Sequence, residues 1–335
     1  MTDVNVNKDE LYELALKKLL ASGLNEASAK EVADVLIYAD SHGVRSHGVM
    51  RVEHYCKRLD NGGLNKDAKV SFEEVSASAA VLDSDDGMGH SGMIVATEKA
   101  CDMAQATGIG MVTVKNTSHC GALAYFSELA AKQGCISIVL TQTDAAVAPF
   151  GGAEKFFGTN PIAFGFPVEG KDPVIVDFAT SAIAYGKVLH ALETNGTLPM
   201  GTARDKDGAF TTDPKEYHCL THFGDHKGYG VALAIDALTG VLMGANYGPH
   251  ITAMYGDYTK MRGLVSMIIC IDPAKLGNAG FGALMGKMVN ELHAVKPAQG
   301  FDKVQVPGDP NQAYYAQCLK EGVPVAKPVY DYLTS

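Results

Sequence analysis

Residues 108–142 decide the fold, and they read GIGMVTVKNTSHCGALAYFSELAAKQGCISIVLTQ. The apolar run at 108–115 predicts a strand, and residues 121–133 predict a helix that ends at Gly134. Residues 135–142 predict a second strand, rich in isoleucine, valine and leucine. A strand, a helix and a strand in succession are a unit of layered α/β domains.

The same alternation continues on both sides of this stretch. Upstream, residues 79–83 predict a strand and residues 90–107 a helix. Downstream, apolar runs at 173–178 and 264–272 predict two further strands, whereas residues 186–225 are rich in turn formers. The expected fold class is therefore α/β.

Helical patterns dominate the two ends of the chain. The predicted helices cover residues 8–22, 25–40, 46–60, 227–245 and 280–295. A turn at 306–308 and two short helical patterns follow. We expect residues 1–69 and 225–335 to form one helical domain, and residues 70–224 to form the α/β domain.

Composition restricts the class of partner and the cellular compartment. The net charge of −10, with no basic stripe, argues against nucleic acid. Residues 1–10 are polar, and the most apolar stretch, 231–245, is shorter than the roughly 20 residues of a membrane helix. We therefore expect no signal peptide and no membrane span. Seven scattered cysteines without a C-x-x-C pair indicate free thiols in a reducing cytoplasm.

The segment DSHGVRSHGVMR, residues 40–51, concentrates two histidines and two arginines in twelve residues. On a helix that starts near Ser46, the side chains of His47, Arg51 and Tyr55 would share one face. An arginine with neighbouring donors can bind a small carboxylate through two parallel hydrogen bonds. The alternative is a solvated basic face.

His119 lies between a predicted strand and a predicted helix, within NTSHCG. Catalytic groups often sit at the carboxyl ends of strands in α/β folds, and a histidine can exchange protons near neutral pH. His119 is therefore a candidate general acid/base. The alternative is a loop histidine that only caps the next helix.

Two other patterns could indicate a dinucleotide site and a metal site. Residues 87–92, GMGHSG, match the dinucleotide-binding G-x-G-x-x-G. Acidic residues crowd this loop, and the next strand ends without the expected acid, which argues against a Rossmann fold. His218, His222 and His226 are spaced by four and suggest a metal-dependent hydrolase as an alternative enzyme class, although Gly224 would break a helix there.

Seven spaced motifs together resemble the malate/L-lactate dehydrogenase family that lacks a Rossmann fold. They are DSHGVRSHG (40–48) with Arg51, NTSHCG (116–121), FGG (150–152), GTNP (158–161), DFAT (177–180), TTDP (211–214) and HKGYG (226–230). The match runs in order through nearly the whole chain and is highly specific. It implies a layered mixed sheet with its own mode of cofactor binding, and homodimers with the site near the subunit interface.

The resemblance also implies roles for individual residues. It makes His119 the acid/base, and it makes His47, Arg51, Tyr55 and Asn160 substrate-binding residues. It assigns cofactor contacts to Thr143, Asp177, Phe178, Ala179, Lys227, Pro307 and Gly308. It implies no metal.

The implied activity is NAD-dependent oxidation of a small 2-hydroxy acid. Within the family, the resemblance is greatest to the members that convert (S)-ureidoglycolate to oxalurate in allantoin degradation. Malate, L-lactate and sulfolactate are the alternative substrates, and NADP is the alternative cofactor.

Overall fold

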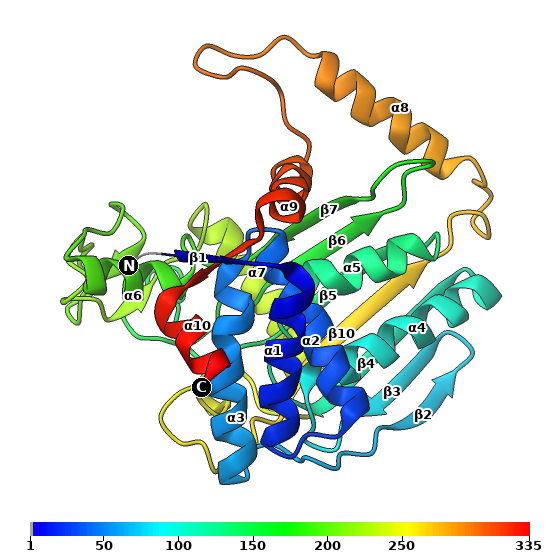
Figure 1. Ribbon diagram of the computed structural model, residues 1–335. Coiled ribbons are helices and arrows are strands. Elements are labelled where there is room, and N and C mark those ends of the chain that lie inside the picture. Colours follow the sequence, from blue (N-terminus) through cyan, green and yellow to red (C-terminus); the bar gives the residue numbers. More distant parts are fainter. Residues whose placement is uncertain (1–2) are drawn as a thin grey trace.

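A seven-stranded mixed sheet lies at the centre of the computed structural model, which describes residues 3–335 (Figure 1). Its strands, in their order across the sheet, are β2 (Ser71–Ser76), β3 (Ala79–Asp83), β4 (Ile109–Thr117), β10 (Leu264–Ile271), β5 (Ile136–Thr141), β6 (Ile162–Phe166) and β7 (Val174–Phe178). The expected α/β class with a mixed sheet is confirmed.

Four of these strands run in the same direction. β3 pairs parallel with β4, and both β4 and β5 pair antiparallel with β10 between them. β6 is antiparallel to both β5 and β7. The carboxyl ends of β3, β4, β5 and β7 therefore lie at one edge of the sheet. Open α/β sheets bind their ligands outside such an edge.

Helices cover both faces of the sheet. The helices are α1 (Lys8–Ala21), α2 (Glu26–Ser41), α3 (Val52–Asn61), α4 (Gly89–Thr107), α5 (Leu123–Lys132), α6 (Tyr185–Thr194), α7 (His226–Asp236), α8 (Phe281–Ala294), α9 (Asp309–Glu321) and α10 (Lys327–Thr334). Val139 of β5 is buried in the cluster that contains α4 and α5, whereas its neighbour Leu140 packs with Ile235 of α7. Successive side chains of a strand point to opposite faces, so α7 covers the face opposite α4 and α5.

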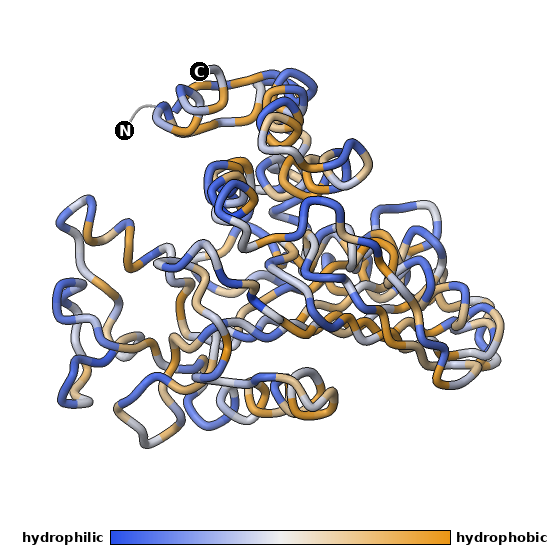
Figure 2. Tube along the Cα trace, turned by 90° about the horizontal axis from the view of Figure 1, so that it is seen from below, coloured by the Kyte–Doolittle hydropathy of each residue, from blue (hydrophilic) through white to orange (hydrophobic). Residues whose placement is uncertain are grey.

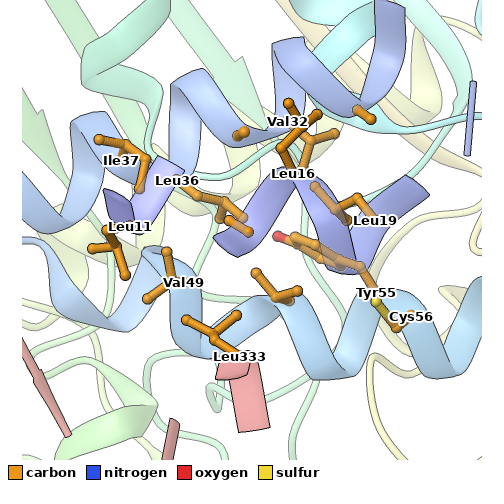
Figure 3. Close-up of a cluster of buried hydrophobic side chains, with 14 of the residues drawn as sticks. Leu11, Leu16, Leu19, Val32, Leu36, Ile37, Val49, Tyr55, Cys56 and Leu333 are labelled. Atoms are coloured by element: carbon orange, nitrogen blue, oxygen red, sulfur yellow. The ribbon is translucent and has the colours of Figure 1, made fainter. Parts of the chain in front are cut away.

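The two ends of the chain pack together. β1 (Asp3–Val6) pairs antiparallel with β11 (Val323–Ala326), and Figures 1 and 2 show these N-terminal and C-terminal segments on the same side of the molecule. A buried apolar cluster joins α1, α2 and α3 to the C-terminal segments. Figure 3 shows Leu11, Tyr55 and Leu333 within this cluster, so a residue of the candidate site is anchored in it.

Strand β10 corrects the predicted domain boundary. The sequence assigns residues 225–335 to the helical domain, but β10 comes from this part and lies in the middle of the sheet. Its run LVSMIICI is almost continuously apolar, as a strand covered on both faces requires. The division at residue 225 is therefore wrong for this strand.

Two predicted helices are shorter than expected. The helix predicted at 46–60 begins only at Val52, because residues 45–51 form two 3₁₀ turns, Arg45–His47 and Val49–Arg51. The helix predicted at 227–245 ends as an α-helix at Asp236 and continues as one π-helical turn. None of the helices within residues 3–335 is long and apolar enough to cross a bilayer.

Candidate active site

His119 lies in the loop that follows β4, at the edge where the parallel strands end. Its Nδ1 lies 2.6 Å from the hydroxyl oxygen of Tyr55 and 3.3 Å from the backbone nitrogen of Gly121. The ring of His47 stacks on it, with the ring centroids 5.4 Å apart. Because these contacts use Nδ1, Nε2 is the nitrogen left to exchange a proton with a ligand. It can accept one when the ring hydrogen is on Nδ1 and points at the Tyr55 oxygen.

Two hydrogen bonds within the protein orient Arg51. Its Nε donates to the carbonyl of Ser46 over 2.7 Å, and its Nη1 donates to the hydroxyl of Tyr255. His47 and Arg51 belong to separate 3₁₀ turns, so the predicted single helical face is wrong. The structure nevertheless brings His47, Arg51 and Tyr55 around His119.

Burial and neighbouring charge keep the imidazoles of His47 and His119 neutral beside the positive charge of Arg51. Burial lowers the pKa of His119 well below its usual value, and nearby His47 and Arg51 lower it further. Burial and then Arg51 lower the pKa of His47 to about 4. A neutral imidazole can accept a proton, and the guanidinium can hold an anion. The arrangement therefore suits a base next to a carboxylate site.

A buried carboxyl group shapes the segment that carries His47 and Arg51. Asp40, at the end of α2, accepts the backbone N–H of Val49 over 2.6 Å. A Cβ atom on Gly48 would lie 1.9 Å from the Oδ1 of Asp40, so only glycine fits there. Asp40 thus interrupts the predicted helix and sets the direction in which Arg51 emerges.

Asp40 should make the stability of the fold depend on pH. Burial raises its pKa to about 7, whereas an unfolded aspartate ionises near about 3.9. The folded chain therefore holds this proton more tightly, and the resulting stabilisation is lost as the pH rises through about 7. Between pH 4 and pH 8, we expect the free energy of unfolding to fall less in Asp40→Asn than in the wild type. The amide oxygen of this variant can still accept the N–H of Val49.

Urea unfolding of both proteins at a series of pH values measures this difference. Other buried acids, such as Asp236, contribute equally to both proteins and cancel in the comparison. Parallel pH curves for the wild type and Asp40→Asn would contradict the assignment.

Three of the residues assigned to the cofactor lie at the same sheet edge. Asp177, Phe178 and Ala179 form or follow the end of β7, and the Asp177 carboxylate accepts the N–H of Ala124 in the first turn of α5. Gly308 approaches the same strand: its Cβ would lie 3.6 Å from the backbone nitrogen of Ile175. The segment with Pro307 and Gly308 therefore lies beside β7.

Thr143 and Lys227 complete this candidate set. Thr143 follows β5, and its hydroxyl accepts the backbone N–H of Thr159 over 2.8 Å. Lys227, in the first turn of α7, has an exposed side chain that joins none of the ion pairs found within residues 3–335. A free cation near backbone segments that permit close approach suits an anionic ligand such as a dinucleotide.

Asn160 has a different role from the predicted one. Its side chain is fully buried, and its two amide hydrogens face the carbonyl of Ala232 and the carboxylate of Asp236. Its Oδ1 accepts the backbone N–H of Thr143 over 3.0 Å. The amide is thus used within the fold, where it positions Thr143, and the structure does not present it to a substrate.

The three histidines spaced by four do not form a metal site. His218 pairs with Glu154, His222 bonds to the carbonyl of Thr180, and the ring of His226 packs edge-on against Phe150. The described residues contain no group of three potential metal ligands. The metal-dependent hydrolase hypothesis is therefore wrong for this cluster.

Close packing explains the glycine-rich segment 87–92 at the start of α4. A Cβ on Gly89 would lie 2.2 Å from the carbonyl oxygen of Ser118, and one on Gly92 would lie 2.7 Å from the hydroxyl of Ser84. The N–H of Gly89 donates to the hydroxyl of Ser118 over 3.0 Å. The start of α4 is thus covered by the loop that carries His119, in agreement with the rejected Rossmann fingerprint.

Sequence reasoning missed three residues of the site. Tyr255 bonds to Arg51, and the buried Arg262 pairs with Asp144 over 2.5 Å. These residues come from distant parts of the chain, and no spacing connects them to the motifs around His47 and His119. A buried ion pair leaves no periodic pattern in a sequence.

Comparison with known protein families agrees with this geometry. The family model described as Malate/L-lactate dehydrogenase matches residues 6–334. Ureidoglycolate dehydrogenase (NAD(+)) of Escherichia coli (strain K12) is 37% identical over 333 residues, which cover 99% of this chain and 95% of the relative. L-sulfolactate dehydrogenase of Methanocaldococcus jannaschii is 36% identical, over 98% of this chain and 94% of the relative.

Solved structures show the same architecture. The crystal structure of malate dehydrogenase from Entamoeba histolytica superposes with a TM-score of 0.93 and 28% identity, covering 99% of this chain and 97% of that one. The sulfolactate dehydrogenase from Methanocaldococcus jannaschii superposes with a TM-score of 0.90 and 34% identity, covering 98% and 95%.

Proposed function

The chain belongs to the malate/L-lactate dehydrogenase family, and from this premise we propose that it oxidises (S)-ureidoglycolate to oxalurate with NAD in the degradation of allantoin. One observation carries the proposal: the neutral His119 imidazole lies beside the Arg51 guanidinium at the carboxyl end of β4. A 2-hydroxy acid presents a carboxylate and a hydroxyl group on adjacent carbons. Arg51 can bind the first group while His119 accepts the proton of the second.

Each residue of the site would contribute to a different part of the reaction. Arg51, with His47 beside it, would hold the carboxylate and so fix the direction of the C2–H bond. His119 would take the hydroxyl proton on Nε2, while Tyr55 holds its Nδ1. When bound, NAD supplies the acceptor for the hydride that leaves C2. Tyr55 is itself buried in the apolar cluster of Figure 3, which fixes its hydroxyl beside His119.

The residues around the edge of β7 fit a dinucleotide. Thr143, Asp177, Phe178 and Ala179 would contact the nicotinamide half, and Lys227 would meet the anionic phosphates. Pro307 and Gly308 would line the other end of the cofactor. NAD is the preferred form because the Escherichia coli ureidoglycolate dehydrogenases, of similar length and 37–38% identity, carry NAD(+) in their names.

A panel assay tests substrate and cofactor together. Ureidoglycolate, malate, L-lactate and sulfolactate are each offered with NAD and with NADP, and reduced nicotinamide is followed by absorbance. We expect the highest kcat/KM with ureidoglycolate and NAD. A higher value with malate or sulfolactate would replace the substrate, and a higher value with NADP would replace the cofactor. No turnover with any of the four acids would contradict the proposal.

We also propose that the enzyme acts as a homodimer in the cytoplasm. Helix α8 and the segment after it project from the body of the chain (Figure 1), and their exposed apolar side chains include Leu284, Met288 and Phe301. A projecting apolar arm is suited to packing against a second copy. All seven cysteines are buried free thiols, which supports a reducing compartment.

A further inference from the structure

His90 is a fully buried histidine next to the acid/base that the proposed mechanism does not use. It lies in the first turn of α4, within the glycine-rich segment 87–92, to which no cofactor role is assigned. Its Nε2 lies 3.4 Å from the hydroxyl oxygen of Tyr55. Its ring centroid is 5.2 Å from that of Tyr55 and 6.3 Å from that of His119.

The three side chains form one hydrogen-bonded chain. The Tyr55 hydroxyl oxygen lies 2.6 Å from His119 Nδ1 and 3.4 Å from His90 Nε2. Within residues 3–335, these two nitrogens are its only hydrogen-bond partners. A phenol has one proton to donate, so it can donate to only one of the two histidines at a time.

We propose that His90 is a positioning residue that accepts a hydrogen bond from the Tyr55 hydroxyl and so keeps His119 in the tautomer that can act as a base. The inference rests on the proposed function, in which His119 takes a proton from the substrate. A neutral imidazole can accept that proton on Nε2 only when its single hydrogen is on Nδ1, and the Nδ1 hydrogen points at the Tyr55 oxygen. The Tyr55 hydrogen must then turn away, and His90 Nε2 is the acceptor that it meets.

The environment of His90 suits this role. Burial lowers the pKa of His90 to about 3, so the ring stays neutral and retains an acceptor nitrogen. Its Nδ1 has no hydrogen-bond partner among the described residues, so no competing bond fixes the tautomer of the ring. The ring is also held in place: a Cβ on Gly121 would lie 3.1 Å from His90 Nε2.

The effect falls on proton transfer and not on substrate binding. In the other tautomer of His119, Nε2 carries the hydrogen and Tyr55 donates to Nδ1, so the ring can bind a hydroxyl group but cannot take its proton. Without His90, the base tautomer leaves the Tyr55 hydrogen buried and unpaired, so a smaller fraction of the enzyme adopts it. A smaller reactive fraction lowers kcat and leaves KM nearly constant.

The test compares apolar and polar replacements of His90. In His90→Leu and His90→Met, we expect kcat to fall roughly 10–100-fold, with the KM values for the hydroxy acid and NAD changed less than about threefold. His90→Gln places an amide oxygen near the position of Nε2 and should keep kcat within about threefold. A Gln variant as slow as both apolar variants, or an unchanged kcat in a folded apolar variant, would overturn the proposal.

A double-mutant cycle separates this role from a general packing effect. If His90 acts through Tyr55, His90→Leu should lower kcat less than about twofold in a Tyr55→Phe background. Equal factors in both backgrounds would show that His90 acts on packing and would overturn the proposal.

A titration without turnover distinguishes failure of this inference from failure of the proposed function. With ¹⁵N-labelled histidine, the pKa of His119 is followed by NMR in the wild type, His90→Leu and His90→Gln. His47, Arg51 and Arg262, the other charged or titratable neighbours that act on His119, are the same in all three. We expect a lower pKa in His90→Leu alone, because its imidazolium lacks the acceptor chain. Equal values in all three proteins would overturn the proposal even if the enzyme oxidises ureidoglycolate.

Discussion

Replacing His119 by alanine should lower kcat for the 2-hydroxy acid by roughly 10²–10⁴-fold, the usual contribution of a positioned acid/base. His119 is held by Tyr55 through Nδ1 and stays neutral, so it is ready to accept a proton on Nε2. The alanine variant keeps Arg51 and the cofactor residues, so substrate and NAD should still bind. Steady-state kinetics with ureidoglycolate and NAD measure the loss.

The matched control is His218→Ala. His218 is another histidine with a defined partner, Glu154, but it lies outside the site. We expect its kcat to remain within about twofold of the wild type. Turnover by His119→Ala within a few-fold of the wild type would remove His119 from the role of acid/base.

Replacing Arg51 by lysine should raise the KM for the hydroxy acid roughly 10–100-fold and leave the KM for NAD nearly unchanged. A lysine keeps the positive charge but loses the planar pair of donors that matches a carboxylate. It also cannot keep both bonds that orient Arg51, to the carbonyl of Ser46 and to the hydroxyl of Tyr255. One lost charged hydrogen bond corresponds to about this factor.

Tyr255→Phe is the control for orientation alone. It removes one of the two orienting bonds and leaves the guanidinium in place, so its effect on KM should be smaller than that of Arg51→Lys. If Arg51→Lys weakened NAD and the hydroxy acid by the same factor, the assignment of Arg51 to the substrate carboxylate would be contradicted.

Much of the fold follows from local sequence patterns. The helix predicted at 8–22 forms α1, which the side chain of Asn7 caps, and the apolar run at 79–83 forms β3 with the predicted bounds. Short-range periodicity and helix caps depend on residues a few positions apart, so a single sequence carries them. The predicted helix over 46–60 was wrong because its interruption depends on Asp40, whose carboxylate reaches Val49 from another helix.

Some residues of the candidate site could likewise be predicted from the sequence, and others could not. The types and spacing of His47, Arg51 and His119 pointed to a carboxylate site with an acid/base, and family motifs supported that hypothesis. The sequence offered no sign that Asn160 would be enclosed by Asp236, or that Tyr255 would orient Arg51. Such contacts join residues more than 70 positions apart.

The sequence alone therefore determined the α/β class, the order of most elements and the family, because these depend on local periodicity and on motifs read in order. The tertiary structure alone decided that β10 enters the centre of the sheet and that His119, Tyr55 and His90 meet in one hydrogen-bonded chain. The physical reason is that the sheet register brings the carboxyl ends of β3 and β4 side by side, a non-local arrangement that no short stretch of sequence encodes.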